Sequence, residues 1–398
     1  MKTNMESNGA TGVKGGSAEG EELRRRAYRL CVLKTGPNIK RLADKPQSCA
    51  WAEDGDYFAC KEGFFEIGNW TSSFFTGMAL LAWRETEDEY FLKQVLRLAP
   101  HYREKVFTRH LDTHHDLGFL YSLYSVALYK LTGDKQHRET GLRAAEVLSQ
   151  RFNPKGNFIR AWGRMDDPDP ATSGMAIIDC LMNLPLLHWA AQESGQARFR
   201  DIALRHADTT LRVLVRPDDS VYHAYRFDLA TGRPARGDTY GGCAVESHWA
   251  RGTAWAIYGF ALSYRYARDP RYLEASLRLA RKFNASLDGE IVPLWDFRLP
   301  AGQEAIRDAS AAAIAVCGLQ ELLKHRPGEE DLAKAARRLL GRLCSEDYLD
   351  FNESCPGVQR RGQVGDGKGT GKNAYTSWGD YFLMEALATE LFQFGSFW

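Results

Sequence analysis

The chain has 398 residues, and its 52 Lys and Arg residues almost balance its 51 Asp and Glu residues, which leaves a formal net charge of +1. This balance excludes a polycationic protein that binds nucleic acid through its net charge. With 44% hydrophobic and 26% charged residues, the composition is typical of a globular protein with a substantial core. No stretch reaches the roughly 18 uninterrupted apolar residues that would indicate a membrane-spanning helix, so we expect no membrane partner.

The first residues of the chain are polar and predict no folded structure. Residues 1–20 are rich in glycine, serine and asparagine, and they contain neither the apolar segment of a secretory signal nor the arginine-rich pattern of a transit peptide. We therefore expect a disordered N-terminal lead over residues 1–20 and a single catalytic domain over residues 21–398.

The cysteine pattern bears on the redox environment of the protein. The eight cysteines form no Cys-x-x-Cys pair, and several fall within apolar, helix-like stretches. They are Cys31, Cys49, Cys60, Cys180, Cys243, Cys317, Cys344 and Cys355. This spacing is typical of reduced core cysteines and predicts a cytoplasmic protein.

Apolar residues recur at helical spacing from residue 21 onward, whereas alternation typical of strands is scarce. In chain order the predicted helices cover residues 21–35, 71–85, 88–107, 116–131, 136–152, 173–193, 197–214, 247–267, 271–286, 306–324, 328–346 and 376–394. The helices that begin near 71, 116, 173, 247, 306 and 376 contain almost no charged residue, as expected of helices buried on all sides. The helices between them carry many Arg, Lys and Glu residues, which indicates one face in water.

Two kinds of helix that alternate along the chain predict an all-α fold, an (α/α)6 barrel of six inner and six outer helices. The helix over residues 21–35 completes the outer set. The inner helices do not begin at a fixed spacing, which disfavours a solenoid of stacked repeats. In such a ring every loop that leads into an inner helix lies at the same end of the barrel, so we expect the functional site there.

One acid stands alone in the predicted inner helix over residues 173–193. Asp179 is the only Asp, Glu, Lys or Arg in residues 171–191, and a buried carboxylate is costly unless it is paired, hydrogen-bonded or protonated. Burial favours the neutral form of such an acid, which suits a general acid near neutral pH. A structural Asp satisfied by hydroxyl groups or by an arginine is the alternative. Pro185 is expected to kink the helix.

A second acid, Asp116, precedes a predicted helix that carries no formal charge before Lys130. It is either the N-cap of that helix or a functional carboxylate, and the two roles can coexist. Asp116 also ends a dense cluster of potential metal ligands, which are His110, Asp112, His114, His115 and Asp116. Their spacing matches none of the familiar zinc patterns, so we expect no metal ion.

A cation and an aromatic ring share one face of the predicted helix over residues 247–267. Arg251 is the only formal charge in residues 247–264, and Trp255 follows it by four positions. Such a pair suits an anionic ring, since the guanidinium group can pair with a carboxylate while the indole packs on sugar. Alternatively, Arg251 neutralises Asp116 or Asp179 inside the barrel. The tryptophans near inner-helix starts are core residues or ligand platforms; they are Trp70, Trp162, Trp249, Trp255, Trp295 and Trp378.

Motifs of nucleotide-binding proteins and serine hydrolases are absent: there is no P-loop, no Gly-x-Gly-x-x-Gly after a strand, and no Gly-x-Ser-x-Gly. The glycine-rich stretch over residues 365–372 has no preceding strand pattern, so it is a weak signal for phosphate binding. Its two lysines, Lys368 and Lys372, could instead contact a substituent of a substrate.

Seven short motifs follow one another in chain order between Trp70 and Leu391. They are His115-Asp-Leu-Gly-Phe119, Ile178-Asp-Cys-Leu-Met-Asn-Leu-Pro-Leu-Leu187, Val215-Arg-Pro-Asp-Asp-Ser220 with Tyr222-His223, Trp249-Ala-Arg-Gly-x-Ala-Trp-Ala-Ile-Tyr-Gly-Phe260, Pro293-x-Trp-Asp-Phe297, Asp308-Ala-Ser-Ala-Ala-Ala313 and Gly379-Asp-Tyr381. In this order the sequence resembles the unsaturated glucuronyl hydrolases, glycoside hydrolase family 88.

The resemblance implies an (α/α)6-barrel enzyme that needs no metal or other cofactor. Its substrate would be an oligosaccharide whose non-reducing end carries the Δ4,5-unsaturated uronic acid that polysaccharide lyases leave. The implied reaction is hydration of the double bond: an acid protonates C4, water adds at C5, and the hemiketal opens and expels the remaining sugar. The resemblance makes Asp179 the general acid and base and Asp116 the second essential carboxylate. The substrate-binding residues that it implies are Trp70, Trp162, His223, Arg251 and Trp255.

One stretch departs from the family pattern. After Thr239 the family has a His-Gln-Gly-Tyr type of segment, whereas this chain has Tyr240-Gly-Gly-Cys243. We expect an unsaturated glucuronyl hydrolase for glycosaminoglycan-type oligosaccharides, active as a monomer or weak homo-oligomer. The alternatives are an unsaturated rhamnogalacturonyl hydrolase of the same fold and a non-catalytic oligosaccharide-binding barrel. A sugar epimerase would need a pair of histidines, and His223 stands alone beside two acids.

Overall fold

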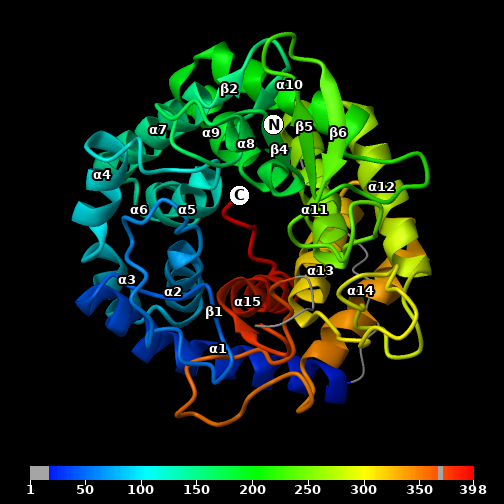
Figure 1. The fold of residues 1–398 in the computed structure, drawn as a ribbon. Coiled ribbons are helices and arrows are strands. Elements are labelled where there is room, and N and C mark those ends of the chain that lie inside the picture. The colour runs from blue at the N-terminus through cyan, green and yellow to red at the C-terminus, as the bar shows by residue number, and fades with distance from the viewer. Residues whose placement is uncertain (1–17, 366–370) are drawn as a thin grey trace, which may run out of the picture.

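The computed structural model describes residues 18–365 and 371–398, and over these residues the chain forms a closed ring of helices (Figure 1). The inner ring runs in chain order through α2 (Ser72–Thr86), the consecutive helices α5 (Leu117–Tyr121), η1 (Ser122–Val126) and α6 (Ala127–Thr132), then α9 (Leu184–Ser194), α11 (Ala250–Ala267), α13 (Ala309–Leu323) and α15 (Ser377–Phe392). Each inner helix packs against the next, and α15 packs against α2, which closes the ring.

The outer helices cover this ring, and their amphipathic sequences explain why. They are α1 (Ala18–Asp44), α3 (Glu89–Leu96), α4 (Ala99–Phe107), α7 (Lys135–Gln150), α10 (Ala197–Val213), α12 (Pro270–Ala285) and α14 (Glu330–Leu343). In α14, for example, Leu332, Leu339 and Leu343 are buried while the charged residues face water. The predicted (α/α)6 barrel is therefore confirmed. Among the described residues, no helix is both long and apolar enough to span a membrane.

The predicted helix over residues 173–193 is wrong as a continuous element. The chain instead forms the short helix α8 (Pro170–Ser173), the strand β4 (Met175–Ile177), the 3₁₀ helix η2 (Ile178–Met182) and then α9. Pairing of β4 with a strand far along the chain outweighs local helical periodicity here. Pro185 therefore lies in the first turn of α9, where a missing N–H costs nothing, and it kinks no helix.

Other element boundaries differ less from the prediction. The segment over residues 88–107 is divided into α3 and α4, and the segment over residues 116–131 contains the π-helical turn η1. The first helix, α1, already begins at Ala18 and continues to Asp44, well past residue 35. The predicted disordered lead falls, as far as residue 17, outside the described residues.

Short antiparallel strands connect the loops between helices. β5 (Ala224–Phe227) lies between β4 and β6 (Pro234–Asp238), with Ile177 opposite Ala224. β1 (Trp51–Ala52) pairs with β7 (Tyr375–Thr376), and β2 (Phe152–Asn153) pairs with β3 (Phe158–Ile159). These pairings fix the loops that lead into the inner helices.

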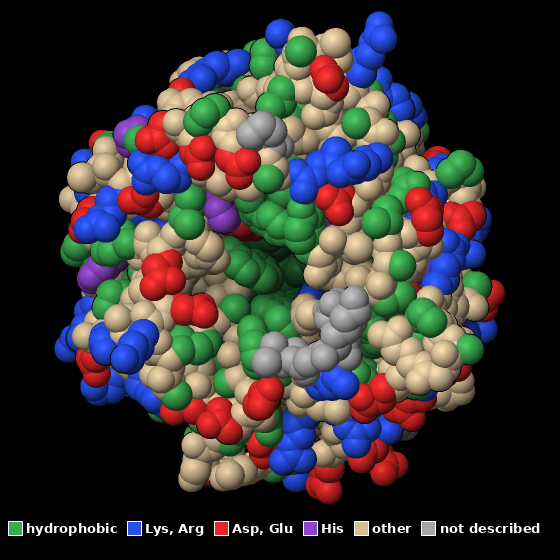
Figure 2. All heavy atoms as spheres, viewed as in Figure 1, with side chains coloured by type: hydrophobic (Ala, Val, Ile, Leu, Met, Phe, Trp, Pro, Cys, Tyr) green, Lys and Arg blue, Asp and Glu red, His purple; other side chains and the backbone are tan. Residues whose placement is uncertain are grey.

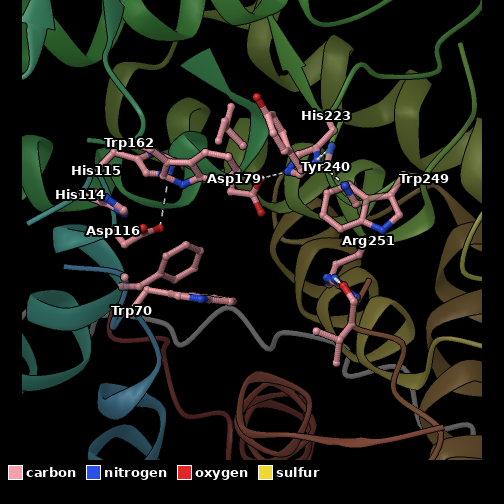
Figure 3. A pocket seen from close by; sticks show the side chains of 15 residues that line it. Trp70, His114, His115, Asp116, Trp162, Asp179, His223, Tyr240, Trp249 and Arg251 are labelled. Carbon is pink, nitrogen blue, oxygen red and sulfur yellow. Dashed lines mark hydrogen bonds and ion pairs between the residues drawn. The ribbon is translucent and has the colours of Figure 1, made fainter. Parts of the chain in front are cut away.

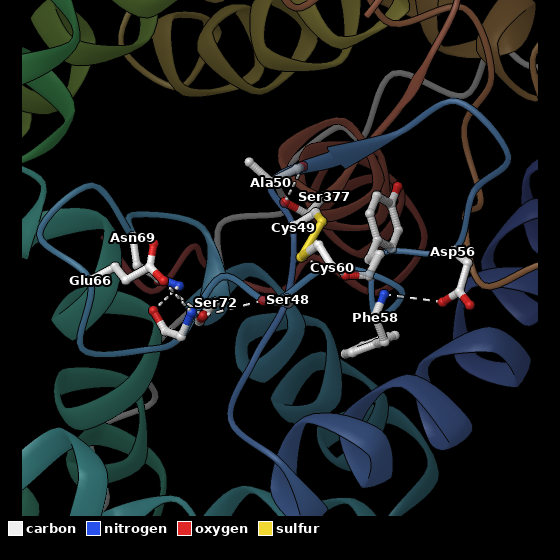
Figure 4. The surroundings of a disulfide bond; sticks show 12 residues. Ser48, Cys49, Ala50, Asp56, Phe58, Cys60, Glu66, Asn69, Ser72 and Ser377 are labelled. Carbon is white, nitrogen blue, oxygen red and sulfur yellow. Dashed lines mark hydrogen bonds between the residues drawn. A yellow bond between two sulfur atoms is a disulfide. The ribbon is translucent and has the colours of Figure 1, made fainter.

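A disulfide bond joins Cys49 and Cys60, 11 positions apart in the loop between α1 and α2 (Figure 4). This finding corrects the prediction that all eight cysteines are reduced core residues. The two cysteines lie in a partly exposed loop that folds back on itself around β1, rather than in a buried helix. The buried free cysteines agree with the prediction; they are Cys31, Cys180, Cys317, Cys344 and Cys355.

The segment after α15 turns into the middle of the ring. Gln393 has a φ of 53°, which ends the helix, and the following residues run toward the centre of the barrel (Figure 1). Phe397 and Trp398 are buried there. The barrel axis is therefore filled by side chains rather than open from end to end.

Candidate active site

A cavity of about 350 Å³ opens at the end of the barrel where loops lead into the inner helices. Figure 2 shows this hollow at the centre of one face, with hydrophobic side chains in its depth. The lining residues are Gly68, Trp70, His114, His115, Asp116, Phe119, Trp162, Ile177, Asp179, His223, Tyr240, Gly241, Trp249, Arg251 and Val364. Six of the seven residues that the sequence singled out are thus brought together in one pocket (Figure 3).

Trp255 is the residue that the structure does not place in the pocket. Its side chain is fully buried, and its ring packs against Phe119 at 5.3 Å and against Phe382 at 5.3 Å between centroids. The shared helical face with Arg251 holds along α11, but Trp255 lies one turn deeper than the cavity floor. It is a core residue that does not line the cavity in this structure, and its contact with a substrate stays a prediction.

Asp116 immediately precedes α5, yet its side chain makes no capping hydrogen bond. Asp116 is thus the N-cap residue of α5 by position, but its carboxyl group is not used to cap the helix. The side chain is 13% exposed, and its Oδ1 lies 3.4 Å from Nε2 of His115. Burial, followed by the negative charge of Asp179, raises the pKa of Asp116 to about 8. The neutral form of Asp116 is therefore favoured near pH 7.

Asp179 reaches the same pocket from η2, directly after β4. Antiparallel pairing of β4 with β5, extended by the hydrogen bond from Ile178 N to His223 O at 2.9 Å, sets Asp179 beside His223. Oδ2 of Asp179 lies 3.5 Å from Nε2 of His223. Among the described residues this oxygen is buried and has no hydrogen-bond partner, while the Asp179 side chain as a whole lines the cavity and is 17% exposed.

The loop after β6 determines which nitrogen of His223 carries the proton. Nδ1 of His223 accepts hydrogen bonds from the backbone N–H groups of Tyr240, at 2.9 Å, and Gly241, at 2.8 Å. Because Nδ1 accepts, the ring proton must be on Nε2. Nε2 lies on the side of Asp179, 3.5 Å from its Oδ2.

Arg151 holds the loops that carry two of the pocket residues, and reasoning from the sequence missed it. Its guanidinium group is buried and donates to the backbone oxygens of Thr113, Arg160, Ala161 and Gly163 at 2.8 to 3.1 Å. These carbonyls flank Asp116 on one side and Trp162 on the other. Burial and the nearby Arg160 lower the pKa of Arg151 to about 9, whereas its positive charge partly opposes the rise in the pKa of Asp116.

Arg251 pairs with neither Asp116 nor Asp179, so that alternative is wrong. Nη1 of Arg251 lies 2.7 Å from Oδ2 of Asp308 and also donates to the backbone oxygen of Gln363, while Nη2 donates to Val364 O at 2.9 Å. The guanidinium group therefore ties α13 to the chain that leads into residues 366–370, at the rim of the pocket. Its side chain remains 6% exposed.

Aromatic rings form two walls of the pocket. Trp70 stacks on Trp378, with 5.2 Å between centroids and 26° between planes, and lies 5.4 Å from Phe119. Opposite, Trp162 and Tyr240 meet edge to face at 4.7 Å and 71°. Apolar ring faces of this kind pack on the C–H faces of sugars.

The departure from the family pattern lies in this second wall. Tyr240 is 44% exposed, and its hydroxyl group accepts from Arg226. Only glycine fits at position 241, because a Cβ on Gly241 would lie 2.7 Å from the ring of Trp249. An aromatic ring therefore stands where the family pattern has a polar pair.

The metal-capable cluster and the glycine-rich stretch contribute little to the described site. Among the described residues, no group of three or more His, Cys, Asp or Glu side chains could hold a metal ion; Asp112 instead pairs with Arg164. Of the glycine-rich stretch, residues 366–370 with Lys368 lie outside the described residues. Lys372 forms an ion pair with Glu304 at 2.9 Å and is not among the lining residues.

Comparison with known proteins identifies the family. The family model described as Glycosyl Hydrolase Family 88 matches residues 47–377. The chain is 38% identical over 324 residues to the unsaturated glucuronyl hydrolase of Bacillus sp. (strain GL1), covering 80% of this chain and 85% of that protein. It is 37% identical over 337 residues to the unsaturated chondroitin disaccharide hydrolase of Streptococcus pyogenes serotype M1, covering 83% of each.

A solved structure agrees with these sequence relatives. The crystal structure of the Bacillus sp. GL1 unsaturated glucuronyl hydrolase, described as responsible for the degradation of glycosaminoglycan, superposes with a TM-score of 0.84. The match has 35% sequence identity and covers 92% of this chain and 96% of that one. The chain is therefore a glycoside hydrolase that belongs to Glycosyl Hydrolase Family 88, as the seven motifs in its sequence predicted.

Proposed function

We propose that this enzyme is an unsaturated glucuronyl hydrolase, which releases the Δ4,5-unsaturated uronic acid from the non-reducing end of lyase-generated, glycosaminoglycan-type oligosaccharides. The observation that carries the proposal is the pair of carboxyl groups, Asp116 and Asp179, at the bottom of an aromatic-walled pocket. Burial, followed by the negative charge of Asp179, raises the pKa of Asp116 to about 8, so this site holds an acid in its neutral form near pH 7. Protonation of a carbon atom requires such an available acid.

The chemistry begins with transfer of a proton from one of the two acids to C4 of the sugar. The positive charge that develops at C5 and the ring oxygen is stabilised by the negative charge left on the pair. Water then adds at C5 and gives its proton back to the pair, so the acid is regenerated. The hemiketal opens and expels the remaining sugar, and no metal or other cofactor takes part in this scheme.

We assign the transfer to C4 to Asp179, on the family resemblance and on its place in the lining of the pocket. Asp116 would bind ring hydroxyls and hold the charge of the pair constant. His223 would orient Asp179 through Nε2–H, and Trp70, Trp162 and Arg251 would bind the substrate or hold the rim around it.

The test follows the ultraviolet absorbance of the conjugated double bond, using unsaturated disaccharides from chondroitin, hyaluronan, heparin and rhamnogalacturonan. We expect the absorbance to fall with the wild-type enzyme and to persist with Asp179→Asn. Preference for the rhamnose-linked substrate would favour an unsaturated rhamnogalacturonyl hydrolase instead. Persistent absorbance with every substrate, together with tight binding in calorimetry, would show a non-catalytic binding barrel.

An analogue with sulfur in place of the glycosidic oxygen separates hydration from direct cleavage at C1. Hydration acts on C4 and C5, so the analogue should still lose its absorbance at a rate comparable with that of the natural disaccharide. Direct cleavage depends on protonation of the glycosidic atom, which sulfur accepts poorly, so an inert analogue would contradict the hydration scheme.

A cytoplasmic location and a monomeric or weakly associated state stay predictions. The disulfide between Cys49 and Cys60 bears on the first of these, because thiols are normally kept reduced in the cytoplasm. Alkylation of freshly lysed cells followed by mass spectrometry would report whether the two cysteines are oxidised in their own compartment. Light scattering on the purified chain would report its mass.

A further inference from the structure

The end of the described chain fills the middle of the barrel beneath the pocket. From Phe394 onward the segment runs from α15 into the ring (Figure 1). Lys130, on α6, donates to the backbone oxygen of Phe397 at 2.8 Å, and Arg265, on α11, donates to that of Trp398. Cations from two inner helices therefore hold this segment in place.

Trp398 is the side chain that occupies the centre. It is 2% exposed, and its Nε1 donates at 2.9 Å to Oε2 of Glu385, a buried acid that also accepts from the hydroxyl groups of Tyr258 and Tyr381. The ring lies parallel to Phe382, with 6.0 Å between centroids and 8° between planes. Burial of a large aromatic side chain with its N–H satisfied is an arrangement that fixes the ring in one orientation.

Trp398 also touches the pocket through one residue. Its ring meets Phe119 edge to face, with 5.8 Å between centroids and 89° between planes. Phe119 lines the cavity, contacts Trp70, and lies three positions after Asp116 in α5. Phe119 therefore connects Trp398 to both the aromatic wall and the helix that carries the first carboxyl group.

We propose that Trp398 is a positioning residue for the reaction: by supporting Phe119 from below, it sets the depth of the pocket and the place of α5. This inference rests on the proposed function, since its measure is turnover of the unsaturated disaccharide. Without the indole, Phe119 would lack its neighbour on the barrel axis and could move away from Trp70 and the sugar. A shift of about 1 Å in such a support can cost as much as a hundredfold in rate.

The test compares kcat and KM of Trp398→Leu and Trp398→Phe with those of the wild type, at temperatures well below the Tm of each variant. We expect Trp398→Leu to lower kcat/KM by about tenfold, mainly through KM. Trp398→Phe retains an aromatic ring against Phe119 and should stay within about threefold of the wild type. Phe394→Leu is the matched control, because Phe394 belongs to the same segment but packs on Phe392 and Arg84 rather than on Phe119.

A double-mutant cycle with Phe119→Leu distinguishes positioning from a general loss of stability. If Trp398 acts through Phe119, adding Trp398→Leu to Phe119→Leu should cause little further loss of kcat/KM. Wild-type kcat and KM in Trp398→Leu, or effects that simply multiply in the double variant, would overturn the inference. An inactive wild type would instead overturn the proposed function, so the two failures are distinguishable.

Discussion

At the scale of single residues, the buried carboxyl group of Asp116 makes the stability of the folded protein depend on pH. In the folded protein Asp116 keeps its proton up to a pKa of about 8, whereas an unfolded Asp has a pKa near 3.8. The unfolded chain releases this proton at lower pH, so the contribution of Asp116 to stability is complete below pH 4 and is lost as the pH rises through 8. Burial of this acid therefore lowers the free energy of unfolding at neutral pH.

Replacing this acid by its neutral isostere should stabilise the protein at high pH. We expect Asp116→Asn to raise the free energy of unfolding on the order of 1–3 kcal/mol at pH 8 and to have little effect at pH 4. Denaturant melts at both pH values measure the difference. Asp347→Asn is the control, since Asp347 is exposed and Arg342 lowers its pKa; it should show no such trend between pH 5 and 8. An equal effect of Asp116→Asn at both pH values would contradict the argument.

Single residues also show which parts of the site a sequence can reveal. A charged residue in an otherwise apolar helical stretch can be recognised from the sequence alone, which is why the sequence predicted Asp116, Asp179 and Arg251. The role of Arg151 was not visible, because its partners are backbone oxygens of a loop that only the fold brings to it. The exclusion of Trp255 from the pocket depends on depth along α11, which periodicity alone does not give.

At the scale of elements, one close backbone contact holds the two carboxyl groups together. Asp116 precedes α5 and Asp179 lies in η2, and these elements meet where Gly118 faces Asn183. A Cβ on Gly118 would lie 2.2 Å from the Cα of Asn183, and the side chain of Asn183 accepts from the backbone N–H of Phe119 at 2.9 Å. Only glycine allows this approach.

Gly118→Ala should therefore separate α5 from η2 and disrupt the pair of acids. We expect loss of kcat/KM by about a hundredfold or more, with a lower Tm, because backbone rather than a flexible side chain must move. Gly341→Ala in α14 is the matched control: no atom lies within 4 Å of its added Cβ, and it should be neutral or stabilising by about 0.5–1 kcal/mol. Wild-type kinetics in Gly118→Ala would refute the role of this contact.

The disulfide acts on a second element, the loop between α1 and α2 that supports β7. β1 in this loop pairs with β7, which leads directly into α15. The bridge closes a loop of 11 positions, for which chain entropy predicts a contribution of about 2–3 kcal/mol. Reduction, or Cys49→Ser with Cys60→Ser, should lower the Tm by several degrees and increase proteolysis within residues 47–63. An unchanged Tm after complete reduction would show that the loop is held by its hydrogen bonds alone.

The alternation of uncharged and charged helices predicted the barrel, but not where its inner elements break. Burial sets which helices lack charge, so the pattern is readable along the chain. The replacement of a helix by β4 and η2 depends on pairing with β5, about 50 positions later, which no local window contains. Asp179 lies in η2, within the segment that the sequence predicted as one continuous helix. The group proposed to transfer the proton therefore lies where the helical pattern of the inner ring is interrupted.

For the molecule as a whole, charge bears on how an anionic substrate arrives. The net charge of +1 gives no long-range attraction, and among the described residues that line the pocket Arg251 is the only Lys or Arg, already paired with Asp308. Binding must therefore come from contacts inside the pocket. We expect kcat/KM for an unsulfated unsaturated disaccharide to change by less than about threefold between about 50 and 500 mM NaCl.

A sulfated disaccharide makes this prediction sharper. If Lys372 leaves Glu304 to meet a sulfate group, the salt dependence should be steeper for the sulfated substrate than for its unsulfated counterpart, and Lys372→Gln should remove the difference. If Lys372 stays paired with Glu304, both substrates should show the same weak dependence, with and without the substitution. A tenfold fall with salt for the unsulfated substrate would contradict the argument from net charge, because it would require a basic surface that guides the substrate before it reaches the pocket.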